Sequence, residues 1–184
     1  MNMAEALARN AQRFPDKPAI VDERRSLSHL ELHLRSNRLA NYLSQQGVTK
    51  GDRVALSCGN RAEHLEFIFA LAKIGAVSVP FDYGWSAQEY VAMIKFFEPS
   101  AFLVEERPET QKVWELANNY LSENRILALG NPAARKATAY EQAVAATTAS
   151  EPTTEIDGKD PFIVMITSGT TGFPKGCVID HETY

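Results

Sequence analysis

The residues best suited to chemistry lie in one loop near the end of the 184-residue sequence. Residues 167–176 read Thr-Ser-Gly-Thr-Thr-Gly-Phe-Pro-Lys-Gly and follow the continuously apolar run 162–166, which predicts a buried strand. Glycines let the backbone turn tightly and bring N–H groups close to an anion, while hydroxyls add donors and a lysine adds positive charge. This combination predicts a loop that binds the phosphates of a polyphosphate ligand.

The predicted phosphate contacts are shared among the hydroxyls, the glycines and the lysine of this loop. They are Thr167, Ser168, Gly169, Thr170, Thr171, Gly172, Lys175 and Gly176. Lys175 is the candidate catalytic residue, because a flexible ammonium can follow a departing phosphate. The alternatives are a solvated lysine and, for the loop as a whole, a Gly/Thr-rich surface hairpin.

Three better-known loop chemistries do not fit. A P-loop needs four residues between its first glycine and a Gly-Lys-Ser/Thr, but here Pro174 precedes Lys175, and residues 177–179 predict a strand instead of a helix. The Gly-x-Gly-x-x-Gly pattern of dinucleotide-binding folds is absent. The Gly-x-Ser-x-Gly elbow of serine hydrolases is also absent, because Thr167 precedes Ser168.

The loop 167–176 resembles the signature loop of the adenylate-forming superfamily, which comprises acyl-CoA synthetases, adenylation domains of peptide synthetases and luciferases. Residues 26–79 resemble the N-terminal region of that superfamily, and Pro80-Phe81-Asp82 resembles its following turn. The resemblance runs from about Ala4 to the last residue. It implies that a carboxylate attacks the α-phosphate of ATP, giving an acyl-adenylate and pyrophosphate, with Mg²⁺ sharing the phosphate charge. The thiol of CoA or of a carrier protein would then displace AMP.

The resemblance also implies that much of the active site lies beyond Tyr184. Members of the superfamily are longer, and their adenine-, ribose- and magnesium-binding residues, hinge and C-terminal catalytic lysine follow the loop. We therefore expect an N-terminal piece of an acid:CoA ligase that is inactive alone, with no metal ligand of its own. The alternatives are an adenylation domain that loads a carrier protein and a non-catalytic nucleotide-binding module. The carboxylic acid is not readable from these residues.

The elements that must position the loop alternate between helix and strand, which predicts a layered α/β fold with a parallel sheet. Strands are predicted at 53–57, 76–79, 101–104, 126–129 and 162–166, after a short hairpin of 19–21 and 26–27. A first helix ends before Pro15, and another covers 111–121. Three more helices are predicted to begin at the capping pairs Ser28/Glu31, Asn60/Glu63 and Ser86/Glu89.

The predicted organisation has three parts. Residues 1–146 form an N-terminal α/β subdomain, and 147–160, rich in Thr, Glu, Pro and Asp, form an exposed linker. Residues 161–184 begin the core that carries the phosphate loop. Because such a piece would leave apolar faces uncovered, we expect self-association.

Composition argues against some partners and compartments for this protein. The formal net charge is −4 and no basic cluster exceeds Arg24-Arg25, which argues against a nucleic-acid partner. Cys58 and Cys177 are far apart, so no disulfide framework is predicted and a reducing cytoplasm fits best. The sequence shows no signal-peptide pattern and no stretch of transmembrane length.

The histidines suggest a metal site only weakly. His29 and His33 are four residues apart on one helical face, as in zinc-binding pairs, but the His-Glu-x-x-His pattern and a third ligand are missing, so a solvated face is favoured. His64 is interpreted as an ordinary first-turn residue. His181 falls where the superfamily often carries a histidine, and we expect a structural role.

Overall fold

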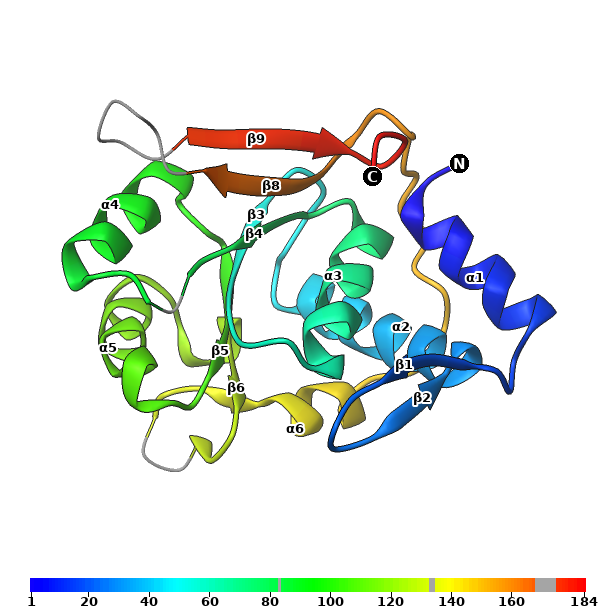
Figure 1. Cartoon of the computed structure of the whole chain (residues 1–184), viewed down its shortest axis with the longest axis horizontal. Helices are drawn as coiled ribbons and strands as arrows, with labels where there is room; N and C mark the ends of the chain where they lie inside the picture. The colour runs from blue at the N-terminus through cyan, green and yellow to red at the C-terminus, as the bar shows by residue number, and fades with distance from the viewer. Residues whose placement is uncertain (83, 133–134, 168–174) are drawn as a thin grey trace.

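The computed structural model describes residues 1–82, 84–132, 135–167 and 175–184, and shows a seven-stranded sheet beside a small hairpin (Figure 1). The large sheet has the strand order β7-β6-β5-β3-β4-β8-β9, in which every neighbouring pair is parallel except β8 and β9. The strands of the large sheet are β3 (Arg53–Ser57), β4 (Val77–Pro80), β5 (Ala101–Glu105), β6 (Ile126–Leu129), β7 (Thr138–Ala139), β8 (Pro161–Thr167) and β9 (Lys175–Asp180). The predicted layered α/β fold is confirmed.

Helices cover both faces of this sheet. They are α1 (Met3–Arg13), α2 (His29–Gln45), α3 (Ala62–Ile74), α4 (Ala87–Phe97), α5 (Gln111–Tyr120) and α6 (Tyr140–Ala145). One core joins α2, α3 and α6 to the sheet, and a second core joins α4 and α5 to it. The alternation of side chains along a strand explains the division, because Leu103 of β5 lies in the first core while its neighbours Phe102 and Val104 lie in the second. No helix among the described residues is long and apolar enough to cross a membrane.

Two of the three predicted capping boxes are confirmed. Ser28 caps α2 and Ser86 caps α4, each with the predicted glutamate completing the reciprocal pair. The third prediction is wrong: α3 begins after Arg61, and no side-chain cap from Asn60 forms. The N–H of Ala62 instead donates to Asp22 Oδ2 at 2.8 Å, from the turn between β1 (Pro18–Val21) and β2 (Ser26–Ser28). A tertiary partner has replaced the local cap.

The segment 147–160 has no helix or strand and lies along α2. Asn37 Nδ2 donates to the carbonyl of Ala149 at 3.0 Å, and Asn41 Nδ2 donates to the carbonyl of Ser150 at 2.9 Å. The segment then leads into β8, which joins the sheet by pairing with β4. The division into 1–146, 147–160 and 161–184 stays a prediction.

Candidate phosphate-binding site

The candidate loop joins the two strands of the β8–β9 hairpin (Figure 1). Thr167, the last residue of β8, lies opposite Lys175, the first residue of β9, and its hydroxyl donates to the Lys175 carbonyl at 3.4 Å. The structure thus brings Thr167, Lys175 and Gly176 together at one end of the hairpin. The other predicted contacts lie outside the described residues: Ser168, Gly169, Thr170, Thr171 and Gly172.

Thr167, the last described residue before the loop, lies at the carboxyl edge of the parallel strands. Because β8 runs parallel to β4, and β4 parallel to β3, Thr167 ends its strand in the same direction as Pro80 of β4 and Ser57 of β3. In open α/β sheets, ligands bind in the crevice outside the carboxyl ends of the strands. Strand β8 therefore ends at the edge of the sheet where a ligand is expected.

Lys175, the candidate catalytic residue, begins β9. Its side chain is exposed, and among the described residues no carboxylate lies within ion-pair distance of its ammonium. The buried ammonium of Lys73, in contrast, lies 2.7 Å from the Glu151 carboxylate. The predicted role of Lys175 in binding phosphate stays a prediction.

The packing around position 176 requires a glycine there, apart from the predicted phosphate contact of Gly176. A Cβ at this position would lie 2.8 Å from Cγ1 of Val164 and 3.3 Å from the ring of Phe97 on α4. Only a residue without a side chain lets β9 lie so close to its neighbours without displacing them. This glycine therefore lets the start of β9 pack closely against Val164 and Phe97.

An aromatic cluster supports α4 and the turn that follows β4. The ring of Phe81 packs 5.3 Å from that of Trp85, 6.0 Å from Tyr90 and 6.2 Å from Phe97. The Tyr90 hydroxyl donates to the Asp82 carbonyl at 2.7 Å, and burial raises the pKa of Tyr90 to about 12. The hydroxyl remains protonated at neutral pH and can act as this donor.

A buried carboxylate, which sequence reasoning did not identify, organises the loops after β3 and β5. Glu105 accepts hydrogen bonds from the Gly59 N–H at 2.9 Å, Arg61 Nη1 at 2.9 Å and Arg107 Nε at 2.8 Å. Burial raises the pKa of Glu105, but these donors outweigh it and the net shift is downward. Glu105 is therefore ionised, and it ties the two loops together.

A second carboxylate was also missed. Glu66 of α3 is 0% exposed and lies 2.8 Å from Arg25 Nη2 and 3.0 Å from Arg35 Nε, and it accepts a 2.8 Å hydrogen bond from the Tyr140 hydroxyl. The sequence did contain a signal for Glu66, because this glutamate lies inside a helix that is apolar on most of its faces. Since a buried charge is tolerated only when it is paired, such a glutamate indicates an ion-pair network. The network links α2, α3, α6 and the β1–β2 hairpin.

The histidines have different roles from those of a metal site. His33 Nε2 lies 3.1 Å from the Glu151 carboxylate, and its Nδ1 lies 3.4 Å from Lys73 Nζ. Burial and the Lys73 charge lower the pKa of His33, so the predicted solvated face is wrong for this residue. No group of three or more His, Cys, Asp or Glu side chains is arranged for a metal in the part of the chain that the structure describes.

His181 lies in a structural setting. It is 3% exposed, its Nδ1 accepts the Met3 N–H at 3.3 Å, and its ring lies 4.9 Å from that of Phe162. Burial lowers the pKa of its imidazole. These contacts join the start of the chain to the end of β9, in agreement with the predicted structural role.

Known proteins share this sequence and fold. The profile of the family described as AMP-binding enzyme matches residues 7–184. The chain is 33% identical to the fatty acid–[acyl-carrier-protein] ligase ScoC of Streptomyces coeruleorubidus, over 95% of this chain and 32% of that protein. It is 30% identical to the medium-chain fatty-acid–CoA ligase of Escherichia coli K12, over 98% of this chain and 33% of that protein.

A solved structure shares the fold of this chain. The inhibitor-bound N-terminal domain of FACL13 from Mycobacterium tuberculosis superposes with a TM-score of 0.81 at 27% identity, over 98% of this chain and 44% of that one. The chain therefore spans less than half of that N-terminal domain. It spans about a third of the two curated relatives, 32% and 33%.

Proposed function

Because this chain belongs to the AMP-binding family of adenylate-forming enzymes, we propose that it carries the phosphate-binding loop of an acid–thiol ligase. The observation that supports this proposal is the exposed Lys175 opposite Thr167 at the carboxyl edge of the sheet, with no carboxylate of the described residues within ion-pair distance. In the proposed reaction, a carboxylic acid and ATP give an acyl-adenylate and pyrophosphate. A thiol then takes the acyl group and releases AMP.

The loop acts by electrostatics and not as a nucleophile. Carboxylate and triphosphate are both anions, so bringing them together costs free energy unless positive groups surround the phosphates. The Lys175 ammonium, the Thr167 hydroxyl and the N–H groups of residues 168–172 supply such groups in the proposal, together with the hydroxyls of Ser168, Thr170 and Thr171. As the bond to the α-phosphate breaks, the same donors stabilise the charge that accumulates on pyrophosphate.

Mg²⁺ has no proposed ligand in this chain. Hard cations such as Mg²⁺ prefer oxygen ligands from carboxylates and phosphates. Among the described residues no group of three or more His, Cys, Asp or Glu side chains is arranged for a metal, and Glu105 is already paired with Arg61 and Arg107. The described residues therefore do not form a magnesium site.

The acid and the thiol acceptor are proposed only as classes. The names of the two curated relatives both specify a fatty acid, which supports a fatty acid or related carboxylic acid as substrate. One of these names specifies CoA and the other an acyl carrier protein, and we propose CoA as the acceptor. A carrier protein is the alternative within the same family.

The experiment that tests this function is ATP-dependent pyrophosphate release with a panel of carboxylic acids. The chain extended to its natural stop codon is compared with residues 1–184 alone. The proposal predicts acid-dependent release by the extended chain and its loss with Lys175→Ala. No release with any acid from a folded, extended chain, or a stop codon directly after Tyr184, would instead favour a non-catalytic nucleotide-binding module.

A further inference from the structure

Side chains of several elements hold the segment 147–156, which has neither helix nor strand, against the rest of the protein. Figure 1 shows it running from the end of α6 past α1 towards the start of β8. Arg38 Nη1 of α2 donates to the carbonyl of Thr147 at 2.7 Å. At the other end, Asn2 Nδ2 donates to the carbonyl of Ile156 at 2.9 Å. Release of this segment would therefore break side-chain contacts without breaking a helix or a sheet.

A further contact of this segment is buried and charged. Lys73 of α3 is 2% exposed, and its ammonium lies 2.7 Å from one carboxylate oxygen of Glu151 in the segment. The other oxygen of this carboxylate lies 3.1 Å from Nε2 of His33 on α2. Nδ1 of the same imidazole lies 3.4 Å from the Lys73 ammonium. The three side chains form a closed ring that joins α2 and α3 to the segment.

The ring determines where His33 carries its proton. An ammonium can only donate hydrogen bonds, and an ionised carboxylate can only accept them. Nδ1 must therefore accept from Lys73, while Nε2 must donate to Glu151. Burial raises the pKa of Glu151, but the hydrogen bond and charge of Lys73 outweigh it, and the net shift is downward. Only a neutral His33, protonated on Nε2, satisfies both contacts.

An added proton on His33 would break this ring. It would place an N–H on Nδ1, facing an ammonium 3.4 Å away that also has only donors. Two positive charges would then share one carboxylate in a partly buried cluster, which is costly. The other ionisable side chains that line the adjoining pocket are Glu5 of α1 and Glu155 of the segment. Neither makes an ion pair with His33 or Lys73 within the part of the chain that the structure describes.

We propose that His33, Lys73 and Glu151 form a pH-sensitive latch, which holds segment 147–156 on α2 and α3 while His33 is neutral and releases it when His33 is protonated. In the released form the imidazole is open to solvent, which stabilises its charge. The segment leads into β8, the strand that ends at Thr167. Release of the latch therefore frees the chain that precedes this strand.

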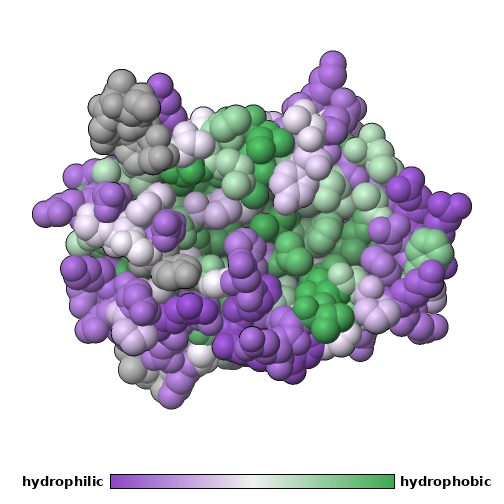
Figure 2. Space-filling view, viewed as in Figure 1, coloured by the Kyte–Doolittle hydropathy of each residue, from purple (hydrophilic) through white to green (hydrophobic). Residues whose placement is uncertain are grey.

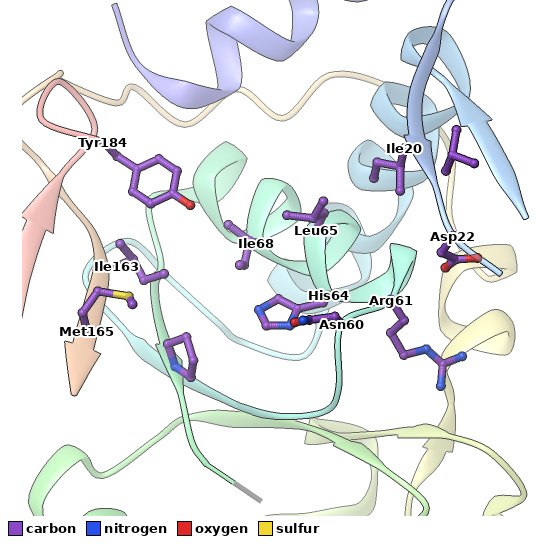
Figure 3. A pocket seen from close by; sticks show the side chains of 12 residues that line it. Ile20, Asp22, Asn60, Arg61, His64, Leu65, Ile68, Ile163, Met165 and Tyr184 are labelled. Atoms are coloured by element: carbon purple, nitrogen blue, oxygen red, sulfur yellow. The ribbon is translucent and has the colours of Figure 1, made fainter. Parts of the chain in front are cut away.

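The latch is separate from the open apolar pocket between α3, β8 and the β1–β2 hairpin (Figure 3). That pocket has a volume of about 460 Å³ and is lined by apolar side chains such as those of Leu65, Ile68 and Met165. Figure 2 shows hydrophobic residues gathered over the middle of one face of the molecule. None of the three latch residues lines the pocket, so the latch can be tested apart from that surface.

Acid should open the latch, because the closed form binds a proton on His33 less tightly than the released form does. Histidine in an exposed chain has a pKa of about 6.5, and burial together with the Lys73 charge lowers the pKa of His33 in the closed latch. The latch is therefore fully formed above about pH 6.5 and weakens as the pH falls through the lower pKa of the closed form. Carboxylates titrate near pH 4, so a change between about pH 7.5 and pH 5.5 reports a histidine.

Proteolysis of the chain extended to its natural stop codon tests the latch, since a protease cleaves a segment from its released form. Cleavage within 147–156 by proteinase K is followed by mass spectrometry at about pH 7.5 and pH 5.5, on either side of the pKa of an exposed histidine. Each rate is divided by the rate for a free peptide with the sequence of 147–156. This ratio corrects for the pH dependence of the protease itself.

Two variants and one control identify the titrating group. His33→Gln places an amide in the ring, which can donate and accept but does not titrate in this range. Lys73→Met removes the ammonium that opposes the added proton. His29→Gln, one turn earlier on α2, is the matched control. Circular dichroism establishes that each variant is folded.

The proposal predicts that the corrected rate rises about fivefold from pH 7.5 to pH 5.5 in the parent and in His29→Gln, as expected for one proton. The rate should change by less than about twofold in His33→Gln, because the titrating group is gone, and in Lys73→Met, because a protonated His33 then faces only Glu151. A constant rate in the parent, or the parent's rise in a folded His33→Gln or Lys73→Met protein, would overturn the proposal. The measurement uses no nucleotide, so its outcome is independent of pyrophosphate release.

Discussion

Gly176 allows close packing between β9, β8 and α4, and this packing can be tested by substitution. We expect Gly176→Ala to destabilise the protein, because the added Cβ would lie 2.8 Å from Val164 Cγ1 and 3.3 Å from the Phe97 ring. Val164 is 5% exposed and Phe97 8%, so neither side chain can move freely away. Overpacking of this kind costs typically about 1–3 kcal/mol. In a chain of this length that corresponds to a fall in Tm of roughly 2–12 °C.

The contact with Val164 also predicts a rescue. Val164→Ala removes the two methyl groups, one of which would clash, and by itself should cost roughly 1.6 kcal/mol at about 0.8 kcal/mol for each buried carbon removed. In the double variant the new methyl at position 176 occupies part of the space that the valine leaves. The double variant should therefore be at least about 0.5 kcal/mol more stable than the sum of the single changes predicts.

The assay is urea unfolding of the four proteins followed by circular dichroism. Coincident unfolding curves from a second probe, tryptophan fluorescence, would establish that one free energy describes each protein. Additive destabilisation, or a Gly176→Ala protein as stable as the parent, would show that the glycine is not required for packing. Its role would then lie in the approach of the backbone to a ligand.

Three further changes have defined outcomes. Glu105→Gln should lower the free energy of unfolding by about 3 kcal/mol, because it leaves Arg61 and Arg107 without their shared carboxylate. The surface change Glu109→Gln should alter this free energy by less than about 0.5 kcal/mol. Equal effects of the two changes in thermal unfolding would contradict the role assigned to Glu105. The N–H groups of Ala62, Arg24 and Arg25 lower the pKa of Asp22 to about 2. The ionised carboxylate therefore stabilises the fold above the pKa of about 3.9 that Asp has in the unfolded chain. This contribution to stability is lost as the pH falls from about 4 to about 2. The difference in Tm between the parent and Asp22→Asn should therefore shrink from pH 5 to pH 2.5, and a constant difference would refute the assignment. Lys175→Ala in the extended chain should reduce pyrophosphate release at least about tenfold. Because the Lys175 side chain is exposed, the Tm should change by no more than about 2 °C. Full activity of the variant would exclude Lys175 from the reaction.

Local patterns predicted much of the fold because most elements are specified by neighbouring residues. Ser28 with Glu31 and Ser86 with Glu89 are complete capping boxes, and each fixes the start of its helix without help from elsewhere in the chain. The apolar runs of β3, β5 and β6 are short and buried on both sides, as expected for parallel strands. The short β7 and α6 were missed, since neither is long enough to show a periodic pattern.

The errors occur where a distant residue replaces a local one. Asn60 stands at the correct spacing for a cap, but Asp22 from the β1–β2 turn takes the Ala62 N–H. His33 was assigned to a solvated face, yet Glu151, more than a hundred residues away in the sequence, covers it. The phosphate-binding loop was predicted from residue types, because glycines, hydroxyls and a lysine in one short segment are typical of anion sites, and it stays a prediction.

The central claim is that the loop between Thr167 and Lys175 binds phosphate, and NMR titration of residues 1–184 with pyrophosphate measures this most directly. We expect saturable shifts of the backbone amides of residues 168–172, 175 and 176, and at least about a fivefold weaker affinity, about 1 kcal/mol, for Lys175→Ala. The exposed amides at Glu109 and Lys112 serve as internal controls and should not shift. Shifts spread evenly over surface lysines, or none in the loop at millimolar pyrophosphate, would contradict the account.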